Sequence, residues 1–154
     1  LKASGISGMI SGQSLDLSEL GKATLTEDEL KQIHLLKTGK LISACFTMVL
    51  ATLSSVNASM HTSLMTYAQH IGLVFQIQDD YLDCYASDNR LGKNRASDQA
   101  NAKTTFATLL GKQQLEDKID FHFTSALNCL NVFGPQAQAL IALTQHVQQR
   151  SQLR

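Results

Sequence analysis

Three aspartates within five positions of an apolar segment are the residues of this sequence best suited to chemistry. Asp79 and Asp83 stand four apart, so a helix would place them on one face, with Asp80 beside it. Carboxylates this close repel one another and need compensating cations. Sites made of carboxylate oxygens suit Mg²⁺, which keeps several waters and often bridges to substrate phosphates. The cluster favours a magnesium site, and a solvated helix face with a chance acidic run is the alternative.

A chance run of the same kind occurs elsewhere in the chain. The segment 116–120 also has acid-acid-x-x-acid spacing, but it lies close to Lys112 and Lys118 and reads as an exposed face. The Asp79 cluster instead lies between the apolar segment 71–75 and Tyr81-Leu82. Exposure is less expected there, which favours a functional role for the cluster.

Basic residues flank the acidic cluster on both sides in the sequence. Lys37-Thr38-Gly39 comes before it, and Lys93 and Lys103 come after it. Lysines bind phosphates as flexible point charges, although a single lysine is most often an ordinary surface charge. The GxxxxGK[ST] pattern of a P-loop is absent. Lysines together with metal ligands are the combination that a diphosphate group needs.

Helical elements must position these residues, because no segment alternates cleanly with a period of two. Thr26 and Glu29 form a capping box before one helix, which Gly39 could kink. Ser59 is the predicted cap of the next helix, which carries the aspartates. The glycines of residues 1–14 suit either a linker or a helix face in close contact with another backbone. Residues 85–98 read as a polar loop.

The C-terminal third predicts further helices. One runs from about residue 104 to residue 132, with a break at Gly111, and Gly134-Pro135 ends it. The last helix spans residues 136–149. Its predicted apolar stripe consists of Ala139, Leu140, Leu143 and Val147.

Composition excludes several classes of protein. The 154 residues are 44% hydrophobic and 17% charged, which argues against disorder, and the formal net charge of +0 argues against general nucleic-acid binding. The odd set Cys45, Cys84 and Cys129 predicts buried free thiols in a reducing cytosol. The uncharged segment 41–78 is interrupted by polar residues at 54–59, so we expect no membrane span. No secretory signal is visible, and the chain opens with Leu1, which suggests a piece of a longer protein.

The order of the motifs resembles that of the trans-isoprenyl diphosphate synthases, most closely the bacterial farnesyl diphosphate synthase type. Residues 12–17 are similar to the family's GQxLD segment, and residues 33–39 to its IHxxKTG segment. Residues 71–83 match the second aspartate-rich motif and its lead-in. Leu91-Gly92-Lys93, Asp98 and Lys103-Thr104 follow in the expected order. The resemblance covers almost the entire chain.

The resemblance implies an all-α fold, the isoprenoid synthase fold, with helices around a central cavity. Residues 1–154 would be the C-terminal portion of a single synthase domain whose N-terminal half is absent. The implied enzyme is a trans-prenyltransferase of isoprenoid biosynthesis, of the farnesyl or geranyl diphosphate synthase type. It would join an allylic diphosphate (dimethylallyl or geranyl diphosphate) to isopentenyl diphosphate, giving a short-chain trans-prenyl diphosphate and diphosphate.

The resemblance also implies roles for individual residues. Asp79 would bind Mg²⁺ directly, Asp80 and Asp83 would support the ion or its waters, and Mn²⁺ would substitute for it. The remaining site residues would contact substrate. The leaving diphosphate would be bound by Lys37, Lys93 and Lys103. Thr38 and Gln76 would direct oxygen dipoles toward the developing cation, and Phe75 would lie near the isopentenyl tail.

The sequence departs from the family in one respect. The first aspartate-rich motif, the arginines after it and most residues that set product length belong to the absent half, so we expect the 154 residues alone to be inactive. Three hypotheses follow: a portion of a full synthase, a non-catalytic helical partner subunit of one, or a general helical interaction module. The resemblance further implies a cytoplasmic homodimer.

Overall fold

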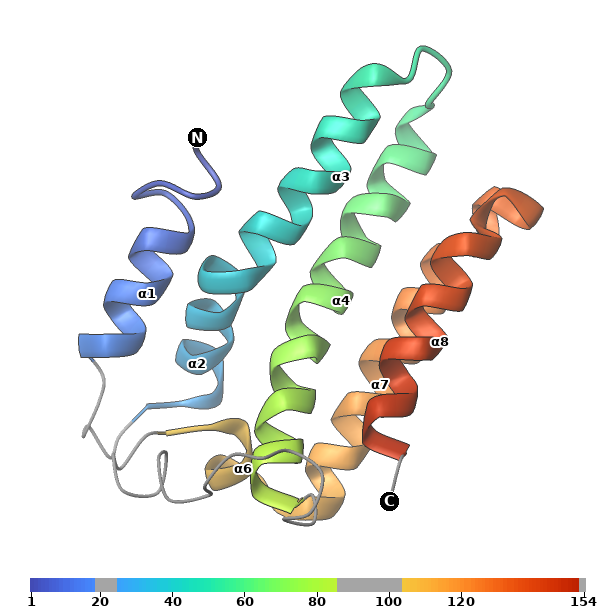
Figure 1. Cartoon of the computed structure of the whole chain (residues 1–154). Coiled ribbons are helices and arrows are strands. Elements are labelled where there is room, and N and C mark those ends of the chain that lie inside the picture. Colours follow the sequence, from blue (N-terminus) through green and yellow to red (C-terminus); the bar gives the residue numbers. More distant parts are fainter. Residues whose placement is uncertain (19–24, 86–103, 153–154) are drawn as a thin grey trace.

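The computed structural model describes residues 1–18, 25–85 and 104–152, and the regular elements in these ranges are helical (Figure 1). The predicted all-α class is therefore confirmed. In chain order the elements are α1 (Met9–Ser18), α2 (Glu27–His34), the π-helical η1 (Leu35–Gly39), α3 (Lys40–Thr52), α4 (Ala58–Tyr85), α6 (Phe106–Leu109), α7 (Lys112–Cys129), the 3₁₀-helical η2 (Asn131–Ala137) and α8 (Gln138–Gln152).

Helix α4 is the central element of the fold. It has 28 residues and packs against α3 on one side and against α7 and α8 on the other (Figure 1). Helical spacing predicts burial of Val74 and Gln78, which are buried, but it misses Leu73, Ile77 and Tyr81. These residues lie inside because α4 has neighbours on several sides, so a single apolar stripe underestimates its buried surface.

Two clusters of buried side chains hold the helices together. The larger lies around the C-terminal half of α4 and joins it to α2, α6 and α7 through residues such as Leu30, Phe106 and Phe123. The smaller joins Tyr67 on α4 to Ala126 on α7 and to the segment that leads into α8. Each large apolar side chain buried in this way contributes about 1.5–3 kcal/mol. The aspartates of α4 therefore lie on a helical segment whose other side is packed into the larger buried cluster.

The ends of the helices test three predictions made from the sequence. The capping box is confirmed: Glu29 N donates to Thr26 Oγ1 at 3.3 Å, and Thr26 N donates to Glu29 Oε2 at 2.8 Å. Gly134 has a positive φ of +53°, which favours glycine, but its ψ of −135° is not that of the predicted left-handed cap, and α7 already ends at Cys129. The prediction that Ser59 caps α4 was wrong, because the Asn57 side chain accepts the Met60 amide at 2.9 Å, two residues earlier in the chain.

Three other expectations are corrected by the fold. Cys45 and Cys84 are exposed and Cys129 is half-buried, so the thiols are not buried as predicted. Glu116 is not an ordinary exposed acid, because its carboxylate accepts the hydroxyl of Tyr81 at 2.7 Å. In α8 the predicted stripe was wrong at two positions: Ala139 and Leu143 are exposed. Thr144 lies inside instead, because its hydroxyl is hydrogen-bonded to that of Tyr67 at 2.8 Å.

Within the part of the chain that the structure describes, one helical stretch is long and apolar enough to cross a membrane. It is the continuous helix Glu27–Thr52, formed by α2, η1 and α3, and only 22% of its apolar window is buried. By length and composition alone such a helix is weak evidence, because core helices of soluble proteins pass the same test. The absence of a membrane span stays a prediction.

A pair of histidines joins α4 to α7. The Nδ1 atoms of His70 and His122 lie 2.8 Å apart, so one ring donates to the other, which is possible only while at least one ring is neutral. His122 is only 9% exposed, more buried than its sequence context suggests. Burial, followed by the positive charges of His70 and Lys118, lowers the pKa of His122 to about 4. Burial also lowers the pKa of His70.

The histidine pair predicts a loss of stability in mild acid. A histidine whose pKa is lowered by folding binds a proton more readily in the unfolded chain, so its penalty is absent above about pH 6.5 and grows as the pH falls toward 4. We expect thermal unfolding midpoints to fall between pH 7 and pH 5, and His122→Asn to reduce that fall by about 2–4 °C. His61→Asn, at an exposed position of α4, is the matched control. Parallel pH profiles for wild type and His122→Asn would contradict the prediction.

Candidate active site

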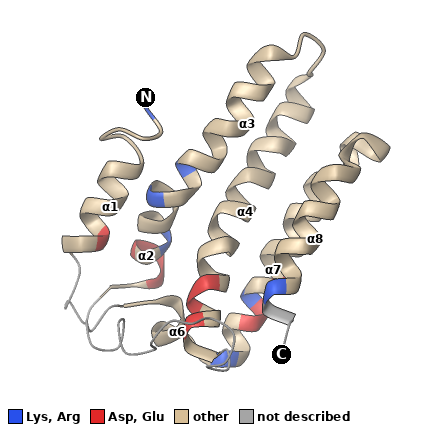
Figure 2. Ribbon diagram, viewed as in Figure 1, with Lys and Arg blue, Asp and Glu red and all other residues tan. Residues whose placement is uncertain are grey.

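The aspartates lie on the last turns of α4. Asp79 and Asp80 are half-buried, whereas Asp83 is exposed. Ile77 and Tyr81, on the opposite side of the same turns, are buried in the larger core cluster and fix the orientation of the helix. Figure 2 shows acidic residues gathered at this end of α4, with basic residues of neighbouring helices beside them.

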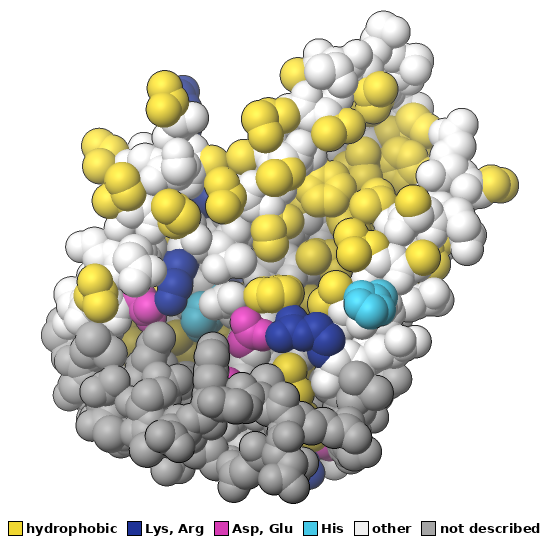
Figure 3. Space-filling model, in the orientation of Figure 1, with side chains coloured by type: hydrophobic (Ala, Val, Ile, Leu, Met, Phe, Trp, Pro, Cys, Tyr) yellow, Lys and Arg dark blue, Asp and Glu magenta, His cyan; other side chains and the backbone are white. Residues whose placement is uncertain are grey.

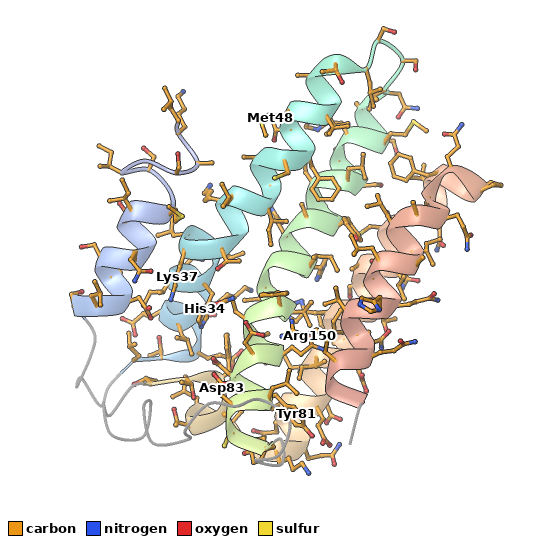
Figure 4. The ribbon with its side chains drawn as sticks, in the orientation of Figure 1. His34, Lys37, Met48, Tyr81, Asp83 and Arg150 are labelled. Carbon is orange, nitrogen blue, oxygen red and sulfur yellow. The ribbon has the colours of Figure 1, made fainter. Side chains whose placement is uncertain are left out.

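Asp79 forms an ion pair with Arg150 of α8. One guanidinium nitrogen of Arg150 lies 2.8 Å from Asp79 Oδ1, and both side chains are 37% exposed. The end of α8 is held in place by Gln78, a fully buried side chain whose amide donates to the carbonyls of Val147 at 2.9 Å and Gln148 at 3.3 Å. Figure 4 shows Arg150 between α8 and the carboxylate end of α4.

Asp80 is hydrogen-bonded to α6. Its Oδ2 accepts the backbone N–H of Phe106, the first residue of α6, at 2.8 Å. Phe106 is buried and stacks on the ring of His34, with 5.6 Å between the ring centroids. Asp80 therefore anchors α6 on the core, and within the described parts of the chain no three His, Cys, Asp or Glu side chains gather in the arrangement of a metal cluster.

Lys37 reaches a buried carboxylate on α1. Its Nζ lies 2.6 Å from Asp16 Oδ2, and Asp16 is only 8% exposed; Figure 4 labels Lys37. The two helices can approach this closely because of Gly12: a Cβ there would lie 2.3 Å from the backbone N of Lys37. Of the glycines near the N-terminus, this is the one that fulfils the predicted close contact inside a helix.

Lys37 and Thr38 belong to the π-helical turn η1, which packs against α4. Gly39, where the sequence suggested a kink, ends this π-helical turn with helical backbone angles (φ −60°, ψ −39°). Gly39 lies directly against Gly72, where a Cβ would lie 2.9 Å from Gly39 Cα. π-helical turns occur frequently at functional sites. Here the turn and its glycine contact place Lys37-Thr38 within a turn or two of Gln76 along α4.

Two of the predicted substrate residues, Phe75 and Gln76, lie half-buried on α4 just before the aspartates. The guanidinium carbon of Arg150 stands 4.9 Å from the centre of the Phe75 ring. Phe75, Asp79 and Arg150 therefore form one contiguous group. Lys93 and Lys103, the remaining predicted diphosphate ligands, lie outside the described residues.

The residues present fit Mg²⁺ in the donors they offer. Mg²⁺ usually takes one or two protein carboxylates and completes its shell with waters and substrate phosphates, so it needs no dedicated three-residue cage. Asp79 and Asp83 supply hard oxygen donors on one face of α4, at its solvent-accessible end. This arrangement suits a metal that arrives together with a phosphate-bearing ligand.

Sequence reasoning missed two charged residues of this region. Asp16 lies in the segment that resembles GQxLD, but nothing in the local sequence indicates that it pairs with Lys37, 21 positions further along the chain. Arg150 carried no signal at all, because 71 positions separate it from Asp79. Only the packing of α8 on α4 brings the two together.

The same architecture occurs in solved prenyl-synthesising enzymes. The geranyltransferase of Legionella pneumophila is 56% identical and superposes with a TM-score of 0.86, covering 99% of this chain and 48% of that one. The geranyltransferase of Helicobacter pylori, solved with magnesium and isoprenyl diphosphate, is 30% identical with a TM-score of 0.76, covering 99% of this chain and 49% of that one. The helices therefore form part of the isoprenoid synthase fold.

The family follows from the sequence comparison. The family model "Polyprenyl synthetase" matches residues 2–128. Farnesyl diphosphate synthase of Escherichia coli (strain K12) is 38% identical over 152 residues, which are 97% of this chain and 50% of that protein. The chain belongs to the polyprenyl synthetase family, and it spans about half the length of the relatives it matches.

The contact between α1 and η1 gives a direct test of how Lys37 is positioned. Gly12→Ala would push a methyl group into the Lys37 backbone, which cannot move as a flexible side chain could. We expect urea unfolding to show a loss of about 1–3 kcal/mol. Gln13→Ala, an exposed neighbour in the same helix, should change stability by less than about 0.5 kcal/mol. Equal stability of the two variants would mean that α1 does not rest on η1.

Proposed function

We propose that this chain supplies one wall of a trans-prenyltransferase active site that joins an allylic diphosphate to isopentenyl diphosphate. The observation that carries the proposal is the pair Asp79 and Asp83 on the accessible end of a core-anchored helix, with Asp79 neutralised by a cation. Membership of the polyprenyl synthetase family supports it. The relative solved with magnesium and isoprenyl diphosphate supports the choice of ligands.

Each proposed residue has a physical task in such a reaction. Mg²⁺ bound through Asp79, with Asp80 and Asp83 supporting it or its waters, would neutralise charge on the diphosphate oxygens as the allylic C–O bond breaks. Lys37 would add a point charge on the same diphosphate, as would Lys93 and Lys103. Asp80 already holds the Phe106 amide, so its share in the metal site is indirect.

The carbon side of the reaction needs different surroundings. The bond that forms joins the allylic carbon to the double bond of isopentenyl diphosphate, and the proton then lost passes to the departed diphosphate. Thr38 and Gln76 would direct oxygen dipoles toward the positive carbon, and Phe75 would exclude water beside the hydrocarbon tail. All three lie on η1 or α4, which touch through Gly39 and Gly72.

An exposed apolar surface supports the view that this wall works with a further helical portion. On α3 and at its C-cap, four apolar side chains are between 46% and 64% exposed: Leu41, Met48, Val49 and Leu53. Figure 3 shows hydrophobic side chains spread over α1 and α3, above a band of charged residues. A surface of this kind usually marks an interface. We propose that the complementary half of the synthase fold covers it.

The same surface keeps a second function open, that of a non-catalytic helical subunit bound to a complete synthase. Both functions predict association through α1 and α3, but only the first requires Asp79 for turnover. The proposed homodimer, the cytoplasmic location and the assignment of residues 1–154 to a single synthase domain rest on the family resemblance.

The first test concerns the 154 residues by themselves. Incubated with dimethylallyl diphosphate, radiolabelled isopentenyl diphosphate and Mg²⁺, they should release no prenyl product, because one wall cannot neutralise the leaving diphosphate. Product should form when the N-terminal half of the Legionella relative is co-expressed with them, and only with Mg²⁺ or Mn²⁺ present. Product from the 154 residues alone would refute the need for a second wall.

The second test uses that reconstituted enzyme. Asp79→Ala should lower turnover by about 100-fold or more, as expected for removal of a group that stabilises developing charge. Asp120→Ala, at an exposed position of α7, is the matched control and should leave turnover unchanged. If Asp79→Ala reconstitutes full activity, the carboxylate face has no part in the reaction and the subunit hypothesis is favoured.

A further inference from the structure

Arg150 occupies the carboxylate that the proposed function assigns to the metal. It is the last residue of α8 whose side chain is described, and it contacts α4 at two places. Its guanidinium pairs with Asp79 Oδ1 at 2.8 Å and lies over the Phe75 ring at 4.9 Å. None of the proposed catalytic steps uses Arg150.

The pairing has a clear electrostatic reason. Three aspartates within five positions of one helix repel each other, and the repulsion is largest when no metal is bound. Asp80 is satisfied by the N–H of Phe106, whereas Asp79 receives a full positive charge from Arg150. Arg150 therefore does for Asp79, in the metal-free protein, what a divalent cation would do.

Arg150 and a metal ion exclude one another at Asp79. A guanidinium 2.8 Å from the ligand oxygen fills one side of the carboxylate, and its charge would repel a divalent cation held there. The side chain has room to leave because it is 37% exposed. The backbone of α8 can stay in place, because Gln78 holds the carbonyls of Val147 and Gln148 independently of Arg150.

We propose that Arg150 is a resident counter-ion of the site: it neutralises Asp79 while the metal is absent and must release Asp79 before a divalent metal binds through it. This inference rests on the proposed metal role of Asp79. The guanidinium also lies over the Phe75 ring, and it can keep this cation–π contact after it leaves Asp79, so Arg150 need not move fully into water. Arg150 is thus a positioning residue, which sets how readily the site loads.

The competing explanation is an ordinary ion pair that only fastens α8 to α4. Both explanations predict that loss of Arg150 lowers the stability of the metal-free protein. They differ in the sign of the effect on metal binding. A fastening pair would leave metal affinity unchanged or weaken it, whereas a competing counter-ion would give tighter metal binding once it is removed, and bound metal would restore the lost stability.

The experiment measures Mn²⁺ binding by electron paramagnetic resonance and thermal unfolding in chelator and at saturating Mn²⁺. We expect Arg150→Gln to bind Mn²⁺ about fivefold more tightly than wild type, the size of an exposed ion pair. Its unfolding midpoint should be about 2–4 °C lower in chelator, with the deficit removed by Mn²⁺. Arg150→Lys, which keeps the charge but loses the planar fork, should lie between the two proteins.

Two variants make the outcome decisive. Lys118→Gln removes a cation that pairs with Glu27 at 2.6 Å between α7 and α2, and it should lower stability without changing Mn²⁺ affinity. Asp79→Asn identifies the binding that depends on Asp79. If that binding exists and Arg150→Gln does not tighten it, the counter-ion role is overturned and the metal site stands. If no Mn²⁺ binding depends on Asp79 in any variant, the proposed metal role fails, and this inference fails with it.

Discussion

Close backbone contact between η1 and α4 is the constraint on which the candidate site depends. A Cβ at Gly72 would lie 2.9 Å from the Gly39 Cα, so a side chain at Gly72 would require η1 and α4 to move apart. Gly12 allows a second contact of the same kind between α1 and the Lys37 backbone. Three helices are thus stacked at backbone distance, and Lys37 and Thr38 lie beside the face of α4 that carries Gln76 and Asp79. Larger residues at Gly12 or Gly72 would push η1 away from α1 or α4.

Charge balance at the site follows from that stacking. Lys37 is close to the carboxylate face of α4, yet its Nζ rests on the buried Asp16 of α1. Asp79 rests on Arg150 from the opposite side of α4. Lys37 and Asp79 therefore each have a partner of opposite charge, and these two ion pairs are partly open to solvent because the side chains of Lys37 and Arg150 are 27% and 37% exposed.

Local chemistry explains which parts of the fold could be read from the sequence. The capping box at Thr26 depends on a few neighbouring residues, and it was predicted correctly. The aspartate-bearing helix was predicted because its apolar spacing is strong. The inward turn of Thr144 could not be predicted, since it depends on the hydroxyl of Tyr67, 77 positions away. The roles of Asp16 and Arg150 were missed for the same reason: each pairs with a residue far along the chain.

The charged surface around Asp79 and the apolar surface of α3 differ in how much their stability depends on a partner. The contacts that fix Asp79, Asp80 and Lys37 come from α1, α6 and α8, all within the described residues. Among the described residues, the apolar side of α3 has no comparable cover, and only 22% of the apolar window in Glu27–Thr52 is buried. Polar geometry is therefore set inside the wall, whereas much of its hydrophobic free energy can be gained only on association. A complementary helical portion would then stabilise the wall and close the hydrocarbon side of the site without having to rebuild its charged side.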